Sequence, residues 1–220
     1  MTGGSHPGRG FSTRAIRAAA RTPQVHQRPS SVPIFQTATF TSEDAERLGD
    51  AIGDGWSGYS YSRLSNPTTR ALGDAYAELA GGEAGYALAS GMGAIHAALA
   101  SCLQAGERVV ASRSLYGSTS ALLGGYFGRF GVRAEIVDTT DAEAVEAALD
   151  AAPTRLLYAE TSANPTTYLA DHRRLSELAH RHGALYLVDN TFASTYVCRP
   201  LELGADLVIE SATKYLGGHS

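Results

Sequence analysis

One lysine stands out among the residues whose side chains could do chemistry. Lys214 is the only lysine of the 220-residue chain, and the other cationic side chains at neutral pH are arginines. A partly desolvated amine loses proton affinity and becomes a nucleophile for a carbonyl carbon, which a permanently protonated guanidinium cannot do. We therefore take Lys214 as the candidate for covalent chemistry. The alternative is a surface lysine that survived a general preference for arginine.

Asp189 is the second candidate, because it ends the apolar segment LYLVD (185–189). A carboxylate at the end of a buried strand needs a partner, since an isolated buried charge is costly. A protonated ring nitrogen of a cofactor would be such a partner. The alternative is an aspartate that caps a helix or binds the backbone of the following turn.

Residues 90–93, Ser-Gly-Met-Gly, stand between an apolar segment and a helical one. Backbone N–H groups at such a helix start favour a phosphate. Ser211 and Thr213, after another apolar segment, could add donors. A dinucleotide-binding motif is excluded because His96 occupies the last glycine position of G-x-G-x-x-G. A plain turn between a strand and a helix remains the alternative.

Tyr116 follows a third apolar segment and begins a Tyr-Gly turn, where an aromatic ring could stack on a flat cofactor. The chain has 11 tyrosines, so a tyrosine with no special role is the alternative.

The elements that must position these residues alternate between strands and helices. Six apolar segments predict strands and are separated by helical patterns, which indicates an α/β fold with a largely parallel sheet flanked by helices. Ligands of such folds lie beyond the carboxyl ends of the strands, here near Ser90, Ser112, Glu160, Asp189 and Ser211. The expected strands are 86–90, 108–112, 135–139, 155–160, 185–190 and 207–211.

Helices are expected between these strands and before them. Asn66-Pro67 predicts a helix start and Gly81-Gly82 its end, and Thr140 with Glu143 predicts a capping box. The other expected helices are a short one near 15–21, one from 91 to 104, one from 118, one ending near 151 and one at 173–183. We expect residues 1–60 to form an extended arm and residues 61–220 to form the cofactor-binding domain.

Composition excludes several classes of protein. A net charge of −4 without a basic block argues against nucleic acid or an anionic membrane as partner. The two cysteines have no C-x-x-C spacing, which argues against a zinc site and fits a reducing compartment. No apolar run is long enough to span a membrane, and the first ten residues lack the apolar region of a secretory signal. We therefore expect a cytoplasmic protein.

The motif Ser211-Ala-Thr-Lys214 also matches the S-x-x-K of serine acyl-enzymes. Those enzymes need a second lysine in a K-T-G motif, and a chain with one lysine cannot contain both.

In eight blocks, taken in order, the sequence resembles the Cys/Met-metabolism, or trans-sulfuration, family of enzymes that depend on pyridoxal 5′-phosphate (PLP). Its members include methionine γ-lyases, cystathionine γ-synthases and O-acetylhomoserine sulfhydrylases. The blocks are PIFQTATF (33–40), YSRLSNPTTRAL (61–72), ALASGMGAI (87–95), LYGSTSALL (115–123), ETSANPT (160–166), VDNTFA (188–193), RPLELGADLV (199–208) and SATKYLGGHS (211–220).

This resemblance implies the large domain of the aspartate-aminotransferase-like, fold type I, PLP enzymes and a role for each matching residue. Lys214 would form the Schiff base with PLP, Asp189 would pair with the pyridine nitrogen, Tyr116 would stack on the ring and act as an acid/base, and Asn164 would approach the phenolic oxygen. Tyr61 and Arg63 would reach the phosphate of a neighbouring subunit, which implies a homo-oligomer built from dimers, with a tetramer expected. The phosphate cup would contain Ser90, Gly91, Met92, Ser211 and Thr213.

The implied reaction is γ-elimination or γ-replacement on a sulfur-containing or O-acylhomoserine amino acid, with a carbon–sulfur lyase favoured over a synthase or sulfhydrylase. Two features depart from the pattern. Methionine γ-lyases typically carry a cysteine where this chain has Ser118, and the family's smaller C-terminal domain is absent. We therefore expect an incomplete chain, and a catalytically incompetent fragment that binds PLP or a partner is the alternative of another class.

Overall fold

The computed structural model describes residues 29–53 and 57–218. The chain divides into two compact units, Met1–Phe35 and Gln36–Ser220. The described part of the first unit, residues 29–35, has no helix or strand. The short helix expected near residues 15–21 lies outside the described residues. The division into an arm and a domain at residue 60 stays a prediction, although the expected arm includes one helix that the sequence pattern did not indicate, α2 (Ala45–Gly53).

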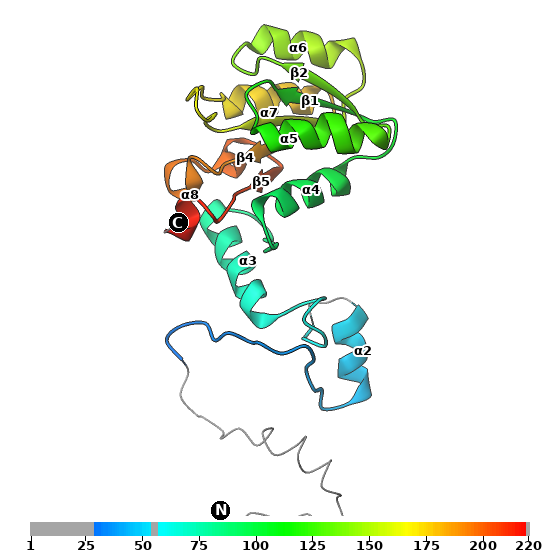
Figure 1. Cartoon of the computed structure of the whole chain (residues 1–220), viewed down its shortest axis with the longest axis vertical. Helices are drawn as coiled ribbons and strands as arrows, with labels where there is room; N and C mark the ends of the chain where they lie inside the picture. The colour runs from blue at the N-terminus through cyan, green and yellow to red at the C-terminus, as the bar shows by residue number, and fades with distance from the viewer. Residues whose placement is uncertain (1–28, 54–56, 219–220) are drawn as a thin grey trace, which may run out of the picture. The chain divides into compact units, whose positions relative to one another are not determined.

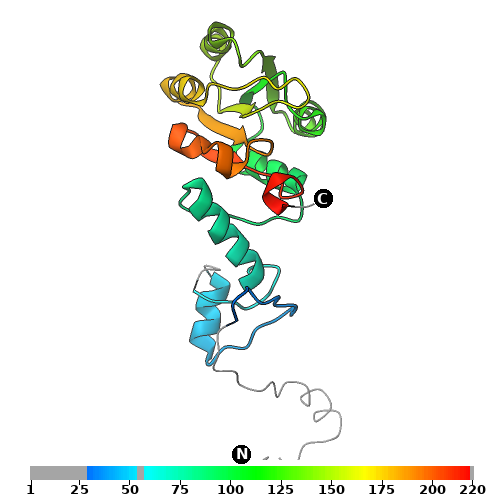
Figure 2. The same cartoon turned by 90° about the vertical axis from the view of Figure 1, so that its left-hand side faces the viewer.

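The second unit is built on one parallel sheet of five strands, with helices on both of its faces (Figures 1 and 2). This confirms the expected fold class. The strands follow the spatial order β2-β1-β3-β4-β5. Their bounds are β1 (Arg108–Ser112), β2 (Arg133–Val137), β3 (Leu156–Glu160), β4 (Leu185–Asp189) and β5 (Leu207–Ile209).

The remaining elements are helical. Asn66 accepts a hydrogen bond from the Thr68 N–H and caps α3, and Gly81 ends it in the left-handed region, as the sequence predicted. The described helices are α3 (Pro67–Ala80), α4 (Gly91–Cys102), α5 (Gly117–Ala121) with its π-helical continuation η1 (Leu122–Phe127), α6 (Ala142–Ala151), α7 (His172–Arg181), α8 (Ser194–Val197) and the 3-10 turns η2 (Pro200–Leu203) and η3 (Tyr215–Gly217).

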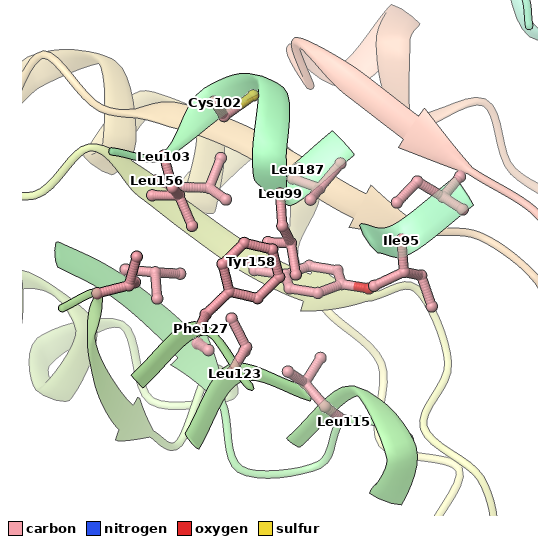
Figure 3. Packing of buried hydrophobic residues seen from close by; sticks show 14 residues of the cluster. Ile95, Leu99, Cys102, Leu103, Leu115, Leu123, Phe127, Leu156, Tyr158 and Leu187 are labelled. Atoms are coloured by element: carbon pink, nitrogen blue, oxygen red, sulfur yellow. The ribbon is translucent and has the colours of Figure 1, made fainter. Parts of the chain in front are cut away.

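The central strands are buried on both faces, so alternate residues enter two separate cores. In β3, Leu156 and Tyr158 belong to the core under α4, α5 and η1, whereas Leu157 and Ala159 belong to the core under α6 and α7. Figure 3 shows the first core, with the Tyr158 ring among Ile95, Leu99 and Phe127. The end of β3 is therefore held rigidly from both sides.

The strand expected at 86–90 is wrong. That segment forms no ladder with any described strand, and most of its residues are exposed. The backbone at the start of this segment instead packs on α3. The contact is so close that a Cβ atom on Gly85 would lie 2.1 Å from the Gly73 carbonyl oxygen. The contact between Gly85 and Gly73 thus holds the segment against a helix. The apolar run of five residues does not indicate such a contact.

Two other local predictions differ from the structure. The strand expected at 135–139 is β2 at Arg133–Val137, with Arg133 opposite Arg108. The capping box of Thr140 and Glu143 is wrong, since Asp141 caps α6 by accepting from the Glu143 and Ala144 N–H groups. The Thr140 hydroxyl donates to Asp138 instead. Aspartate and threonine are both good caps, and the choice depends on where β2 ends.

A chain of buried hydrogen bonds links the ends of β3, β4 and β5 on the α7 side of the sheet. Asn190 donates to Glu210 (2.9 Å) and accepts from the Thr161 hydroxyl (2.7 Å). Because the Thr161 proton is used there, its oxygen accepts from His172 Nε2 (3.0 Å). His172 Nδ1 then accepts from the Tyr186 hydroxyl (2.8 Å). The whole chain has one direction and fixes the neutral form of His172.

We predict that His172 makes stability depend on pH. Burial lowers the pKa of His172 from 6.5 to about 4. The unfolded chain therefore binds a proton below pH 6.5 that the folded chain does not, so stability falls as the pH drops from 6.5 towards 4, by at most about 1.4 kcal/mol per pH unit. Urea unfolding of the whole protein at pH 7.5 and 5.5 measures this loss.

His172→Gln should be less stable at pH 7.5 but should lose less stability at pH 5.5 than the wild type. His180→Gln is the matched control, because His180 is an exposed histidine on the same helix. A pH dependence that is the same for His172→Gln and the wild type would contradict the assignment.

Candidate active site

Several predicted site residues meet at the carboxyl edge of the sheet. Glu160 and Asp189 end neighbouring strands and lie opposite one another in the β3–β4 register. Both are buried, with 9% and 8% of their surface exposed. Asp189 and Leu187 alternate with Val188, so the carboxyl group lies on the α4 side of β4. This edge therefore holds two adjacent carboxyl groups.

The environment of Asp189 favours a cation as its partner. Burial raises its pKa, and the interactions with Thr191 oppose the rise. Asp189 Oδ1 accepts from the Thr191 N–H at 3.0 Å. A bond of this kind, to the backbone of the following turn, is the alternative role that the sequence allowed for Asp189. None of the ion pairs formed within residues 29–53 and 57–218 involves Asp189. A cationic group at this position would therefore be stabilised.

The start of α4 lies against the segment that follows β5. Ser90 Oγ accepts from the Gly93 N–H at 3.0 Å and caps the helix. Gly91 touches Ser211 so closely that a Cβ atom on Gly91 would lie 2.7 Å from the Ser211 Cβ. Met92 packs on the core and fixes the first turn. Backbone N–H groups at a helix start attract anions, so this contact, called the anion wall below, is where the chain would stabilise an anion.

Thr191 ties the carboxylate and the anion wall together. Its hydroxyl accepts from the Ser211 N–H at 2.9 Å, while its own N–H binds Asp189. Lys214 follows in an exposed turn, in which its N–H donates to the Ser211 carbonyl at 3.0 Å. Thr213 is exposed in the same turn. The lysine thus lies at the expected edge, but the described residues do not bury its amine.

Tyr116 and Asn164 follow other strands at the same edge. Tyr116 is exposed and stands immediately before α5, and its N–H donates to Glu160 in a very short hydrogen bond. Asn164 is exposed in the loop after β3, four residues beyond Glu160, and precedes Pro165 through a cis peptide bond. Both side chains are therefore available to a ligand.

Tyr61 and Arg63 do not join this group within the chain. The Arg63 guanidinium lies 5.2 Å from the centre of the Tyr61 ring, so the two residues form a unit of their own. They precede α3, whose 14 residues extend for about 21 Å. The far end of α3 is the one near the sheet, where Gly81 approaches Glu202. The pair is thus separated from the start of α4 by the length of a helix.

The sequence did not single out Thr191 or the role of Glu160. Glu160 was recognisable only as a polar residue at a strand end, and Thr191 only by its place two residues after Asp189. Burial raises the pKa of Glu160 to about 7, the Tyr116 N–H opposes the rise, and the Asp189 charge adds to it.

No group of three or more His, Cys, Asp or Glu residues within the described segments could hold a metal ion. Nor does any helix there have the length and apolar character needed to cross a membrane.

Residues 12–220 match the model of the family described as Cys/Met metabolism PLP-dependent enzyme. The chain belongs to this family. It is 47% identical over 216 residues to an L-methionine gamma-lyase of Pseudomonas putida, which covers 98% of this chain and 54% of the relative. It is 42% identical over 190 residues to a cystathionine gamma-lyase of Bacillus subtilis, which covers 86% of this chain and 48% of the relative. The chain thus spans about half the length of the curated relatives that it matches.

Solved structures of the family share the fold. A putative O-acetylhomoserine (thiol)-lyase of Campylobacter jejuni, solved with an N′-pyridoxyl-lysine-5′-monophosphate, superposes with a TM-score of 0.83 at 33% identity, over 88% of this chain and 47% of that structure. The metB protein of Corynebacterium glutamicum gives a TM-score of 0.81 at 36% identity, over 97% of this chain and 53% of that structure. The sheet described above is therefore the fold type I sheet of PLP enzymes.

We predict that Asp189→Asn in the full-length protein retains PLP but loses at least about 100-fold in kcat, because the neutral amide no longer holds the ring nitrogen protonated. Borohydride reduction followed by peptide mapping measures retention, and the label is expected on Lys214. Asp150→Asn, at an exposed carboxylate bonded to His182, is the control. Near-normal turnover of Asp189→Asn would show that Asp189 has only a structural role.

Proposed function

We propose that the full-length protein is a PLP-dependent enzyme that catalyses γ-elimination, or γ-replacement, on a sulfur-containing or O-acylhomoserine amino acid. The observation that carries this proposal is the convergence at one sheet edge of a buried carboxylate, a capped helix start and the turn with the only lysine, in a chain of a PLP-dependent family. A phosphate, a protonated ring nitrogen and an aldehyde carbon are the groups that these three features suit.

The residues of the edge fit the cofactor. The Gly91–Ser211 contact and the α4 start would hold the phosphate, Asp189 would hold the ring nitrogen, and Lys214 would bind the aldehyde carbon. Thr213, in the same exposed turn, would complete the phosphate cup. When bound, PLP supplies an electron sink that stabilises negative charge on the substrate carbons. Asp189 maintains that property because its charge keeps the ring nitrogen protonated.

Lys214 and Tyr116 would handle the protons. Once the substrate amino group has displaced Lys214 from the aldehyde carbon, the released Lys214 amine would take a proton from the substrate α carbon and return one to a neighbouring carbon. Tyr116 would stack on the ring and donate a proton to the leaving group from the opposite side of the edge. Asn164, in the loop after β3, would orient the ring through its phenolic oxygen.

Within this reaction class we favour a carbon–sulfur lyase. The similarity to L-methionine gamma-lyases and to a cystathionine gamma-lyase supports this choice. Ser118 stands close to Tyr116 at the start of α5 and is exposed, so it is a candidate for contact with the leaving group. A γ-synthase or sulfhydrylase is the alternative, in which a thiol takes the place of water.

The test is a substrate panel on the full-length protein. Methionine, cystathionine and O-acetylhomoserine are supplied with and without an added thiol, and 2-oxo acid and released thiol are measured. We expect 2-oxo acid from a sulfur amino acid without added thiol. A product that forms only when a thiol is added would show a replacement enzyme, and no turnover of any member of the panel would contradict the proposed function.

We also propose that Tyr61 and Arg63 serve the phosphate of a second subunit in a homo-oligomer. The length of α3 separates them from their own anion wall, and a phosphate dianion is best held by a guanidinium in addition to N–H groups. A chain whose only lysine binds the aldehyde carbon has no other amine for that purpose.

Mixing two inactive full-length variants tests this arrangement. Arg63→Ala and Lys214→Ala subunits should regain up to about a quarter of wild-type activity after partial dissociation, because half of the dimers are mixed and one of their two sites is whole. The control is each variant taken alone through the same procedure. Verified mixed dimers without activity would place Arg63 in its own subunit or away from the cofactor.

A further inference from the structure

Glu160 binds the backbone of Tyr116 and has no part in the chemistry proposed above. Its Oε1 atom accepts the backbone N–H of Tyr116, which lies 44 residues earlier in the chain. Only 9% of Glu160 is exposed, because it ends the central strand β3. A buried charge-assisted hydrogen bond from a rigid strand restricts the group it binds more than a surface bond does.

The bond is placed where it determines how Tyr116 enters its helix. The N–H groups of Thr119 and Ser120 donate to the Tyr116 carbonyl at 2.9 and 3.1 Å, so Tyr116 is the residue before the first turn of α5. None of the side chains in this turn caps the helix. The Glu160 carboxylate, from another element, therefore binds the N–H group at the start of the turn.

Tyr158 lies in the core near the same turn, but neither its hydroxyl nor that of Thr119 forms a hydrogen bond within the described segments. It lies two residues before Glu160 on the same face of β3, and Figure 3 shows its ring inside the core. Burial raises the pKa of Tyr158 well above its usual value, and the Asp189 and Glu160 charges add to this. Tyr158 and Thr119 are both fully buried. The hydrogen bond from β3 to this turn is therefore that of Glu160, whose charge can change near neutral pH.

The charge at Asp189 contributes to the protonation state of Glu160. Burial and the Asp189 carboxylate favour the protonated form of Glu160, and the Tyr116 N–H favours the ionised form. The other elements on this face contribute little, since α5 carries no ionisable side chain. The ionisable side chains of α4 are His96, whose ring packs on Tyr126 and Phe127, and the buried thiol of Cys102 at the other end of the helix. A cation bound at Asp189 would therefore favour the ionised form of Glu160 and strengthen its hydrogen bond to Tyr116.

We propose that Glu160 is a positioning residue that fixes the Tyr116 turn over the cofactor ring and tightens when a cationic ring nitrogen occupies the Asp189 position. The inference rests on the proposed function, in which Tyr116 covers the ring. It assigns Glu160 no contact with the substrate. Its effect passes through the backbone of Tyr116.

Hydrogen exchange of the full-length protein tests the contact without any need for turnover. Glu160→Met removes the acceptor but keeps a side chain of similar length, Glu160→Gln keeps the acceptor but removes the charge, and Glu143→Gln is the control at an exposed glutamate in α6. We expect the amide of Tyr116 to exchange faster in Glu160→Met than in Glu160→Gln. We also expect PLP to slow this exchange in the wild type and in Glu143→Gln, but much less in Glu160→Gln. Equal slowing by PLP in Glu160→Gln and the wild type would overturn the proposal.

Activity supplies a second, independent measure. Glu160→Met should retain PLP and lose about tenfold to 100-fold in kcat with little change in KM, and it should change the visible circular dichroism of bound PLP as Tyr116→Phe does. The double variant should be little worse than Tyr116→Phe alone, because both substitutions remove the same function. Losses that multiply would overturn the positioning role. If the wild type binds PLP but turns over no sulfur amino acid, the proposed function fails, while the exchange experiment still decides the role of Glu160.

Discussion

The parallel register of β3 and β4 places two carboxyl groups side by side at the end of a buried sheet. Like charges in such a place cannot both be ionised without a cation or additional hydrogen bonds. The surrounding residues stabilise the two carboxyl groups in different ways. The Thr191 N–H donates to Asp189, and the Tyr116 N–H donates to Glu160. Asp189 is also buried, which suits a cationic ring as its partner. In our proposal the start of α4 holds the negative group of the same ligand.

Most of the sheet could be predicted from the sequence because each central strand is a short apolar run that ends at a polar residue. Such runs are typical of parallel strands covered on both faces, and five of the six expected strands lie within two residues of the predicted bounds, with β2 shifted by two residues towards the N-terminus. The run at 86–90 misled because its partner is a helix glycine, and hydrophobicity does not reveal a contact between two backbones. The helix α2 was missed because it lies among residues whose glycines and polar side chains are typical of loops.

The candidate site divides in the same way. Asp189 and Ser211 could be placed from the rule that ligands lie beyond the carboxyl ends of strands. Ser90 and Gly91 were expected after a strand that does not form, but the helix start predicted there is present. Glu160 had only its position at such an end, and its bond to Tyr116 joins residues that are distant in the chain. Thr191 acts through a hydroxyl and an N–H at once, which no spacing indicates. Tyr61 and Arg63 depend on a second subunit in our proposal, so a single chain could not have displayed their function.

The alternation of β4 has a consequence for how the protein can change over time. Asp189 lies on the α4 side of the sheet, and its neighbour Asn190 belongs to the hydrogen-bond chain on the α7 side. Insertion or deletion of one residue within β4 would exchange the two faces, which would put a neutral amide where a charge is needed and a charge in the scaffold. Length variation among relatives should therefore be confined to the loops before and after β4, while the strand itself tolerates substitution of apolar residues but no shift in frame.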